Sequence, residues 1–225
     1  MMETPVRLLI HGASGRMGQA LMRLAQNDAR LRVSAQSGSR ESDRLRDLPE
    51  FDVAIDFSSP EGFDAVLALC LERGKSLVSG TTGLSAGQFA ALEAAGARIP
   101  VLWASNFSLG VAVLDRLVGQ AGQWLKDWQL DILESHHIHK KDAPSGTALS
   151  LGRTAEAASG KAPVYHSLRG GDIVGEHTVQ FTGMGERIEL THRATNRDIF
   201  AQGALFAAVR LSAKMNGHYR FDDLL

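Results

Sequence analysis

The chain has 225 residues, 44% of them hydrophobic and 22% charged, which suits one large globular domain or two smaller ones and excludes a disordered protein. Its 24 Lys and Arg residues against 25 Asp and Glu residues lack the positive excess of a nucleic-acid-binding protein. The start carries no secretory leader and no segment has 18 uncharged apolar residues, so we expect a cytoplasmic protein that does not enter a membrane.

From residue 6 to about residue 125, short apolar segments alternate with segments of helical spacing. The expected strands are 6–12, 32–37, 51–58, 75–80 and 99–105, and the expected helices between them are 15–26, 61–74 and 85–96. Gly74 is expected to end its helix as a C-terminal cap. Strands that alternate with helices in this way predict a parallel, doubly wound sheet, that is, a Rossmann-like α/β fold.

The pattern changes after a long helix at 108–126. The segments WQLDILES, HTVQFT and RIELTHR alternate apolar and polar residues, and GMGE between the last two is typical of a hairpin turn. They predict a second α+β domain whose sheet is open on one face. Because a final helix at 198–214 is expected to return to the first domain, we predict one domain of residues 1–107 and 198–225 and another of residues 108–197.

The loop GASGRMG follows the first strand and opens the first helix, where backbone N–H groups can hold a phosphate. A tight turn needs glycine for packing alone, so the glycines by themselves are weak evidence. Since strand, loop, helix and next strand follow in order, we favour dinucleotide binding over a purely structural turn. The candidate cofactor residues of this loop are Gly12, Ala13, Ser14, Gly15, Arg16 and Met17.

The acid that usually binds the ribose about 20 residues later is missing, and the second strand leads instead to Arg40. A guanidinium suits a 2′-phosphate, so we expect NADPH to be favoured over NADH, unless Arg40 is merely a solvated loop residue. Two further loops end the fourth and fifth strands, where ligands of such sheets bind. They add the candidate cofactor residues Gly80, Thr81, Thr82, Ala104, Ser105, Asn106 and Phe107.

The segment HHIHKKDAPSGT at 136–147 concentrates three of the eight histidines beside two lysines. Adjacent side chains of an extended segment point apart and lysines repel a dication, so we expect no metal here. Ser145 is a good N-cap for the helical sequence that follows, and a helix N-terminus beside cations favours an organic carboxylate. His and Lys can also donate a proton near neutral pH, so a carboxylate clamp with an acid catalyst competes with a solvated basic turn.

The block ESHHIHKKDAPSGTA resembles the signature of the 4-hydroxy-tetrahydrodipicolinate reductase family, also called dihydrodipicolinate reductases. GASGRMG, DFSSPEG, VSGTTG, SNFSLGV, GGDIVGEHT and GERIELTHRA extend the resemblance over most of the chain, in the right order. It implies an enzyme of the diaminopimelate–lysine pathway that uses NADH or NADPH to reduce the cyclic dicarboxylate imine formed when its hydroxylated substrate loses water.

The resemblance also implies roles for individual residues. It makes His136 the acid/base residue and Lys140 the proton donor, and it leaves His139, Lys141 and His177 without a certain role. Substrate carboxylate would be held by His137, Gly146 and Thr147, with help from Ser145. Cofactor would be held by the loops at 12–17, 80–82 and 104–107.

The second domain would bind substrate and build a homotetramer, as it does in the family. The chain is short around YHSLRGGDIVGEH, where members usually carry a further strand before Gly-Gly-Asp-Ile, so part of that sheet is expected to be trimmed. Two alternatives stay open. One is a sensor that binds NAD(P) and a metabolite without catalysis, and the other is a reductase of a different carboxylated imine.

Overall fold

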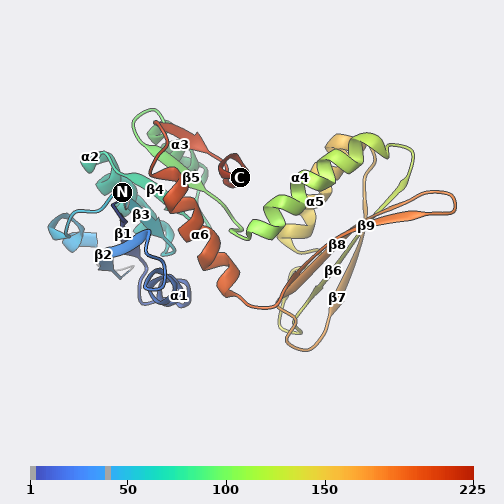
Figure 1. Cartoon of the computed structure of the whole chain (residues 1–225), viewed down its shortest axis with the longest axis horizontal. Helices are drawn as coiled ribbons and strands as arrows, with labels where there is room; N and C mark the ends of the chain where they lie inside the picture. The colour runs from blue at the N-terminus through green and yellow to red at the C-terminus, as the bar shows by residue number, and fades with distance from the viewer. Residues whose placement is uncertain (1–3, 39–41) are drawn as a thin grey trace. The chain divides into compact units, whose positions relative to one another are not determined.

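The computed structural model describes residues 4–38 and 42–225, so the predicted phosphate ligand Arg40 lies outside the described residues. The chain forms two compact units (Figure 1). The first comprises Met1–Phe107 and Phe200–Leu225, and the second comprises Ser108–Ile199. Across the described part of the chain, every helix is too short or too polar to span a bilayer.

Unit 1 is built on a six-stranded sheet in which every neighbouring pair of strands is parallel. The order is β10-β5-β4-β3-β1-β2, so the chain reverses its direction of travel across the sheet between β1 and β3. Ligands of doubly wound sheets bind at this switch point. The strands are β1 (Val6–His11), β2 (Leu31–Ser37), β3 (Val53–Asp56), β4 (Ser76–Ser79), β5 (Pro100–Trp103) and β10 (Gly217–Tyr219).

Capping residues mark an end of two helices of unit 1. Gly74 ends α2 in the left-handed conformation (φ 62°), as expected from the sequence, and Ser85 begins α3 with a capping box. The core on one face of the sheet joins the strands to α2 and α3 through fully buried residues such as Leu9, Leu77 and Phe63. The elements are α1 (Arg16–Ala25), α2 (Pro60–Arg73), α3 (Ala86–Ala95), α6 (Asp198–Leu211) and the 3₁₀ helices Ser42–Asp47 and Phe221–Leu224.

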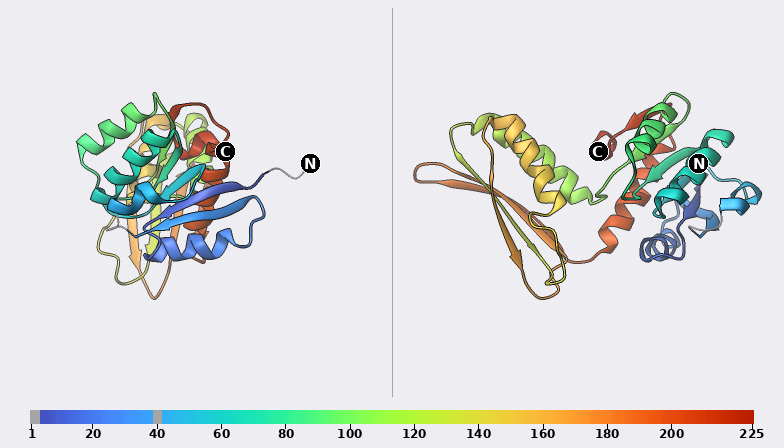
Figure 2. Two further views of the ribbon diagram at one scale, coloured as in Figure 1. Left: turned by 90° about the vertical axis from the view of Figure 1, so that its left-hand side faces the viewer. Right: turned by 180° about the vertical axis from the view of Figure 1, so that it is seen from behind.

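Unit 2 is a four-stranded mixed sheet with two helices on one face. In the order β7-β6-β8-β9, β7 runs parallel to β6, and the other pairs are antiparallel. The helices α4 and α5 lie side by side over one face of the sheet in both views (Figures 1 and 2). The elements are α4 (Leu109–Trp124), β6 (Gln129–His136), α5 (Gly146–Ser159), β7 (Val164–Arg169), β8 (Gly175–Thr182) and β9 (Arg187–Ala194).

The close fit of the two helices depends on small residues. A Cβ added to Gly122 of α4 would lie 2.9 Å from the Cβ of Ala158 in α5, and one added to Gly152 would lie 1.9 Å from the Tyr165 hydroxyl of β7. Below the helices, alternate residues of β6 and β8, among them Ile132, Val179 and Phe181, fill the hydrophobic core of unit 2.

The predicted fold class, a parallel doubly wound domain with a second α+β domain, is confirmed. The expectation of a trimmed second sheet is wrong, because β7 occupies the stretch directly before Gly170 and pairs with β6 along its length. Its sequence VYHSLR hides the strand, since only two of the six residues are aliphatic and both are exposed. The short strand β10, which adds the C-terminal segment to the first sheet, is also absent from the sequence-based prediction.

Candidate functional site

The glycine loop of unit 1 lies against the end of β3, at the switch point of the sheet. Gly12 has a positive φ of 81°, and a Cβ there would lie 2.5 Å from the Phe57 carbonyl oxygen. A Cβ on Gly18 would lie 2.3 Å from the Gly12 carbonyl oxygen. The N-cap of α1, Gly15, provides no side-chain cap for the helix N–H groups. A close backbone approach next to an uncapped helix N-terminus fits a dinucleotide phosphate.

The predicted residues of this loop differ in what they can offer a ligand. The N–H groups of Gly12 and Ala13 both donate to the Ser37 carbonyl oxygen, at 2.9 and 3.0 Å, and both residues are buried. These two residues therefore shape the turn. The residues of the loop that can contact a ligand are the exposed Ser14, Gly15 and Arg16 and the half-buried Met17.

A buried carboxylate, Asp56, joins the ends of β3 and β4. It accepts hydrogen bonds from the hydroxyls of Ser79 and Thr81, both at 2.8 Å, and from the Ser58 backbone N–H at 3.1 Å. Thr81 is only 3% exposed, so its side chain holds the loop and does not face solvent, whereas Thr82 is exposed. Sequence reasoning missed Asp56, although its place at the end of a buried strand marks it as a candidate.

The third predicted loop, 104–107, packs against the same edge of the sheet. The Ala104 N–H donates to the Ser79 carbonyl oxygen at 3.1 Å, and the Phe107 ring meets Phe57 edge-on at 5.4 Å between centroids. A Cβ on Gly80 would lie 2.2 Å from the same Phe57 ring. Phe107 is 2% exposed and can offer a ligand only its backbone, while Ser105 is exposed and Ala104 and Asn106 are half-buried.

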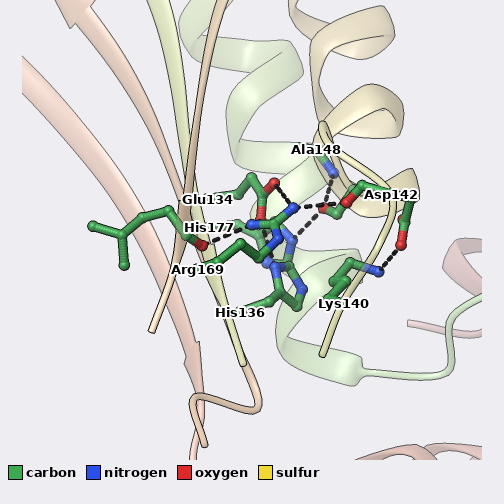
Figure 3. A network of polar contacts seen from close by, with 9 residues as sticks. Glu134, His136, Lys140, Asp142, Ala148, Arg169 and His177 are labelled. Atoms are coloured by element: carbon green, nitrogen blue, oxygen red, sulfur yellow. Dashed lines mark hydrogen bonds and ion pairs between the residues drawn. The ribbon is translucent and has the colours of Figure 1, made fainter. Parts of the chain in front are cut away.

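In unit 2, His136 ends β6 on the face covered by the helices. It is 8% exposed, its Nδ1 is hydrogen-bonded to the Glu134 carboxylate, and its ring meets the His177 ring edge-on at 5.1 Å (Figure 3). Burial lowers the pKa of His136, and the Glu134 carboxylate opposes this effect. The neutral imidazole is therefore favoured, with its second nitrogen, Nε2, left for a ligand.

Glu134 is itself paired with Arg169 from β7. The guanidinium donates to both carboxylate oxygens, at 2.9 and 2.7 Å, and the Glu134 side chain is fully buried. Burial alone would raise the pKa of Glu134, but hydrogen bonds from Arg169, Ser167 and His136 hold it at about 2. Glu134 is therefore a charged acceptor at neutral pH.

Lys140 lies in the turn after β6 and forms an ion pair with Asp142, with 2.8 Å between Nζ and Oδ1. The hydrogen bond from Lys140 lowers the pKa of Asp142, and the backbone N–H of Gly146 contributes in the same direction. Asp142 is an exposed carboxylate that lies beside a lysine and a helix N-terminus. Lys140 and the start of α5 can therefore hold a carboxylate together.

The N-terminus of α5 completes this group of residues. The Ser145 hydroxyl accepts from the Ala148 N–H at 3.2 Å, as its prediction as an N-cap requires, and it bonds His177 Nε2 at 3.1 Å. Gly146 is exposed, with no heavy atom within 4 Å of an added Cβ, and Thr147 is half-buried beside it. Burial lowers the pKa of His177 to about 4, so this histidine is neutral near pH 7.

His137 follows on the other side of the strand end. Its ring lies 6.2 Å from the ring of His139, and its Nδ1 is buried without a hydrogen-bond partner among the described residues. The structure thus brings His136, Lys140 and the start of α5 together through shared partners. His137 meets Lys140 through its backbone, since its carbonyl oxygen accepts from the Lys140 N–H at 3.1 Å.

Sequence reasoning missed the two residues that connect the group, Glu134 and Arg169. Glu134 stands two residues before His136 in a strand, and this spacing puts both side chains on one face, so a signal was present. Arg169 arrives from a strand that was not predicted, and no spacing in the sequence marks it.

Two family models cover nearly the whole chain. The model described as dihydrodipicolinate reductase, N-terminus, matches residues 6–107, and the one described as dihydrodipicolinate reductase, C-terminus, matches residues 110–225.

Relatives of high identity match from end to end. A protein of Stenotrophomonas maltophilia K279a, named 4-hydroxy-tetrahydrodipicolinate reductase, is 63% identical over 239 aligned positions and covers 100% of both chains. A protein of the same name from Xylella fastidiosa 9a5c is 57% identical over 237 positions, again with 100% of both chains covered.

Solved structures share the fold at low identity. A dipicolinate-bound dihydrodipicolinate reductase from Paenisporosarcina sp. TG-14 superposes with a TM-score of 0.85 at 20% identity, covering 99% of this chain and 100% of that one. A myo-inositol dehydrogenase from Corynebacterium glutamicum reaches a TM-score of 0.61 at 12% identity, with 95% and 90% covered.

Proposed function

Because the chain belongs to the dihydrodipicolinate reductase family, we propose that it reduces 4-hydroxy-tetrahydrodipicolinate, through dihydrodipicolinate, to tetrahydrodipicolinate in diaminopimelate and lysine biosynthesis. One observation supports this proposal most strongly: His136, Lys140 and the N-terminus of α5 lie close together and are connected through hydrogen bonds and an ion pair. Such a group combines acid catalysis with carboxylate binding, which this reaction requires.

The enzyme is an oxidoreductase that uses a nicotinamide cofactor, which supplies the hydride when it is bound. The uncapped N-terminus of α1 would take the pyrophosphate, with the exposed residues of the glycine loop around it. Thr82, Ser105 and Asn106 would reach toward the rest of the cofactor from loops held by Asp56 and Phe57. We propose that NADPH is preferred, because Arg40 follows β2 where an acid for the bare ribose is missing.

In unit 2, the substrate carboxylates would be bound by Thr147 and the open backbone at Gly146, and His137 is proposed as a further ligand for them. The Ser145 hydroxyl already accepts from the helix and would add a donor if its own proton turns to the ligand. A clamp of this kind orients the ring, and positioning alone can lower a barrier by several kcal/mol.

Lys140 would protonate the ring carbon next to the one that receives the hydride. Its ammonium lies at 2.8 Å from the exposed Asp142 carboxylate, so it can hold a carboxylate in this place. On binding, a carboxylate of the substrate would replace that of Asp142. His136, neutral and with Nε2 directed away from Glu134, would serve as the acid/base group beside it.

The test supplies freshly generated 4-hydroxy-tetrahydrodipicolinate and follows nicotinamide absorbance with NADPH and with NADH. Oxidation that depends on this substrate supports the proposal, and faster turnover at low concentration with NADPH supports the preference. No oxidation with either cofactor would favour a sensor that binds both molecules without reaction.

We further propose that residues 1–107 and 198–225 bind the dinucleotide, and that residues 108–197 bind substrate and build a cytoplasmic homotetramer. The sheet face opposite α4 and α5 presents exposed apolar side chains of β6 and β7, among them Leu133, Val164 and Leu168 at 40%, 58% and 56% exposure. Such a patch would be covered by a second copy. Light scattering that gives the mass of a monomer at every working concentration would contradict this assembly.

A further inference from the structure

We propose that Glu134 and Arg169 act as one positioning pair, which holds His136 and the turn that carries Lys140 in the arrangement needed for proton transfer. The role rests on the proposed function, since it assigns these two residues to the same reaction. Neither touches the expected substrate position, and each acts through another residue.

The first step is the contact between Glu134 and His136. A fully buried carboxylate bonded to Nδ1 holds the imidazole proton on that nitrogen, which fixes the tautomer and directs Nε2 toward the ligand. Space around Nε2 is kept by Gly175 of β8, where an added Cβ would lie 3.1 Å from that atom. Orientation and tautomer of His136 are therefore both determined by its neighbours.

The second step is the contact between Arg169 and the turn. Beyond its two bonds to Glu134, the guanidinium donates from Nη2 to the Asp142 carbonyl oxygen at 2.7 Å (Figure 3). This bond to the backbone fixes the turn that carries Lys140, whether the Lys140 ammonium pairs with the Asp142 carboxylate, as here, or with a substrate carboxylate. One guanidinium thus connects the proposed acid/base residue to the proposed proton donor, and a lysine at this position could not form the same fork.

The third step is the balance of charge around His136. The titratable and charged groups around His136 include Glu134 on β6, Arg169 on β7, His177 on β8 and Lys140 on the turn. Burial and the two cations lower the pKa of His136, and Glu134 alone raises it. Loss of the Glu134 charge should therefore move the titration of His136 to lower pH.

The decisive variant is Glu134→Gln. Arg169 would take the amide oxygen, so the amide NH₂ would face His136 and move its proton from Nδ1 to Nε2. We expect kcat to fall by about 10²–10⁴-fold, because a histidine in the wrong tautomer cannot act as the acid/base group. The KM for the cofactor should stay unchanged. The pKa of His136, followed by NMR, should fall below that of the parent, because the Glu134 charge that raises it is gone.

Two further variants separate positioning from stability. Asp52→Asn is the control in the other unit. Asp52, just before β3, accepts a two-pronged bond from Arg7 (3.1 and 2.7 Å) at the opposite end of the first sheet from the loops, although this pair is partly exposed. It should lose stability but keep its kcat. The double variant Glu134→Gln/Arg169→Met leaves no unpaired buried charge, so it should regain stability while kcat remains low.

The outcomes are distinct. Near-parental kcat in Glu134→Gln, or recovery of kcat along with stability in the double variant, would overturn the positioning role. A parent protein without reductase activity would refute the proposed function instead. In that event the NMR titration still tests the pair, since an unmoved pKa of His136 in Glu134→Gln contradicts it without any turnover.

Discussion

Replacement of His177 by Gln should remove a large part of the acid sensitivity of unit 2. His177 is 4% exposed, and burial lowers its pKa from 6.5 to about 4. The unfolded chain takes up a proton near pH 6.5 and the folded chain does so only near pH 4. The neutral His177 therefore contributes its full share to the free energy of unfolding above pH 6.5. This contribution, about 3 kcal/mol, is lost as the pH falls through 4.

Urea unfolding at pH 7, 5.5 and 4 measures this effect as the difference between parent and variant. His177→Gln is expected to be less stable than the parent at pH 7, because a buried ring is lost. Between pH 7 and 4, however, the free energy of unfolding of the parent should fall by about 3 kcal/mol more than that of the variant. Ser145→Ala is the control, since it removes the hydrogen-bond partner of His177 and leaves the imidazole buried. It should keep the parental pH dependence.

Equal pH dependence in His177→Gln and the parent would refute the reasoning. It would mean that His177 is protonated as easily in the folded chain as in the unfolded one, so its neutral state could not be attributed to burial.

Further variants test the proposed roles. Lys140→Met keeps the aliphatic stem and removes the acid, so kcat measured in steady state should fall by about 10²–10⁴-fold with little change in NADPH affinity, and a near-parental kcat would place the proton donor elsewhere. His137→Ala should act mainly through a raised KM, because a clamp present in both ground and transition states is uniform binding. Arg40→Ala should weaken NADPH by roughly 1.5–3 kcal/mol in a binding titration and spare NADH, and equal weakening of both cofactors would contradict a contact to the 2′-phosphate.

The fold was largely predictable because its signals are local. β1, β3 and β5 are short, mostly apolar runs, and the predicted caps Gly74 and Ser145 mark where one helix ends and another begins. The two strands that escaped prediction lack such signals. β7 is an edge strand with polar residues at most positions, and β10 has only three residues, so both form because a neighbouring strand supplies hydrogen bonds.

The site was predictable only where its residues are close in the chain. His136, Lys140 and Ser145 fall within one segment whose charge and capping pattern can be read directly. Arg169 lies 35 residues after Glu134 in the sequence. The two residues meet only because β6 and β7 pair in parallel, in a register that places His136 opposite Arg169. A chain can encode that register only through its tertiary packing.

The same register links catalysis to assembly. In the pairing observed, Arg169 points to the face that α4 and α5 cover, and Leu168 therefore points to the open face. A shift by one residue would exchange the two, leaving Glu134 buried without its guanidinium and removing an apolar side chain from the surface proposed to meet another subunit. Because an unpaired buried carboxylate costs several kcal/mol, the Glu134–Arg169 pair also penalises the wrong register of β7. The pair proposed to position His136 thus also helps to specify which side chains the sheet presents for assembly.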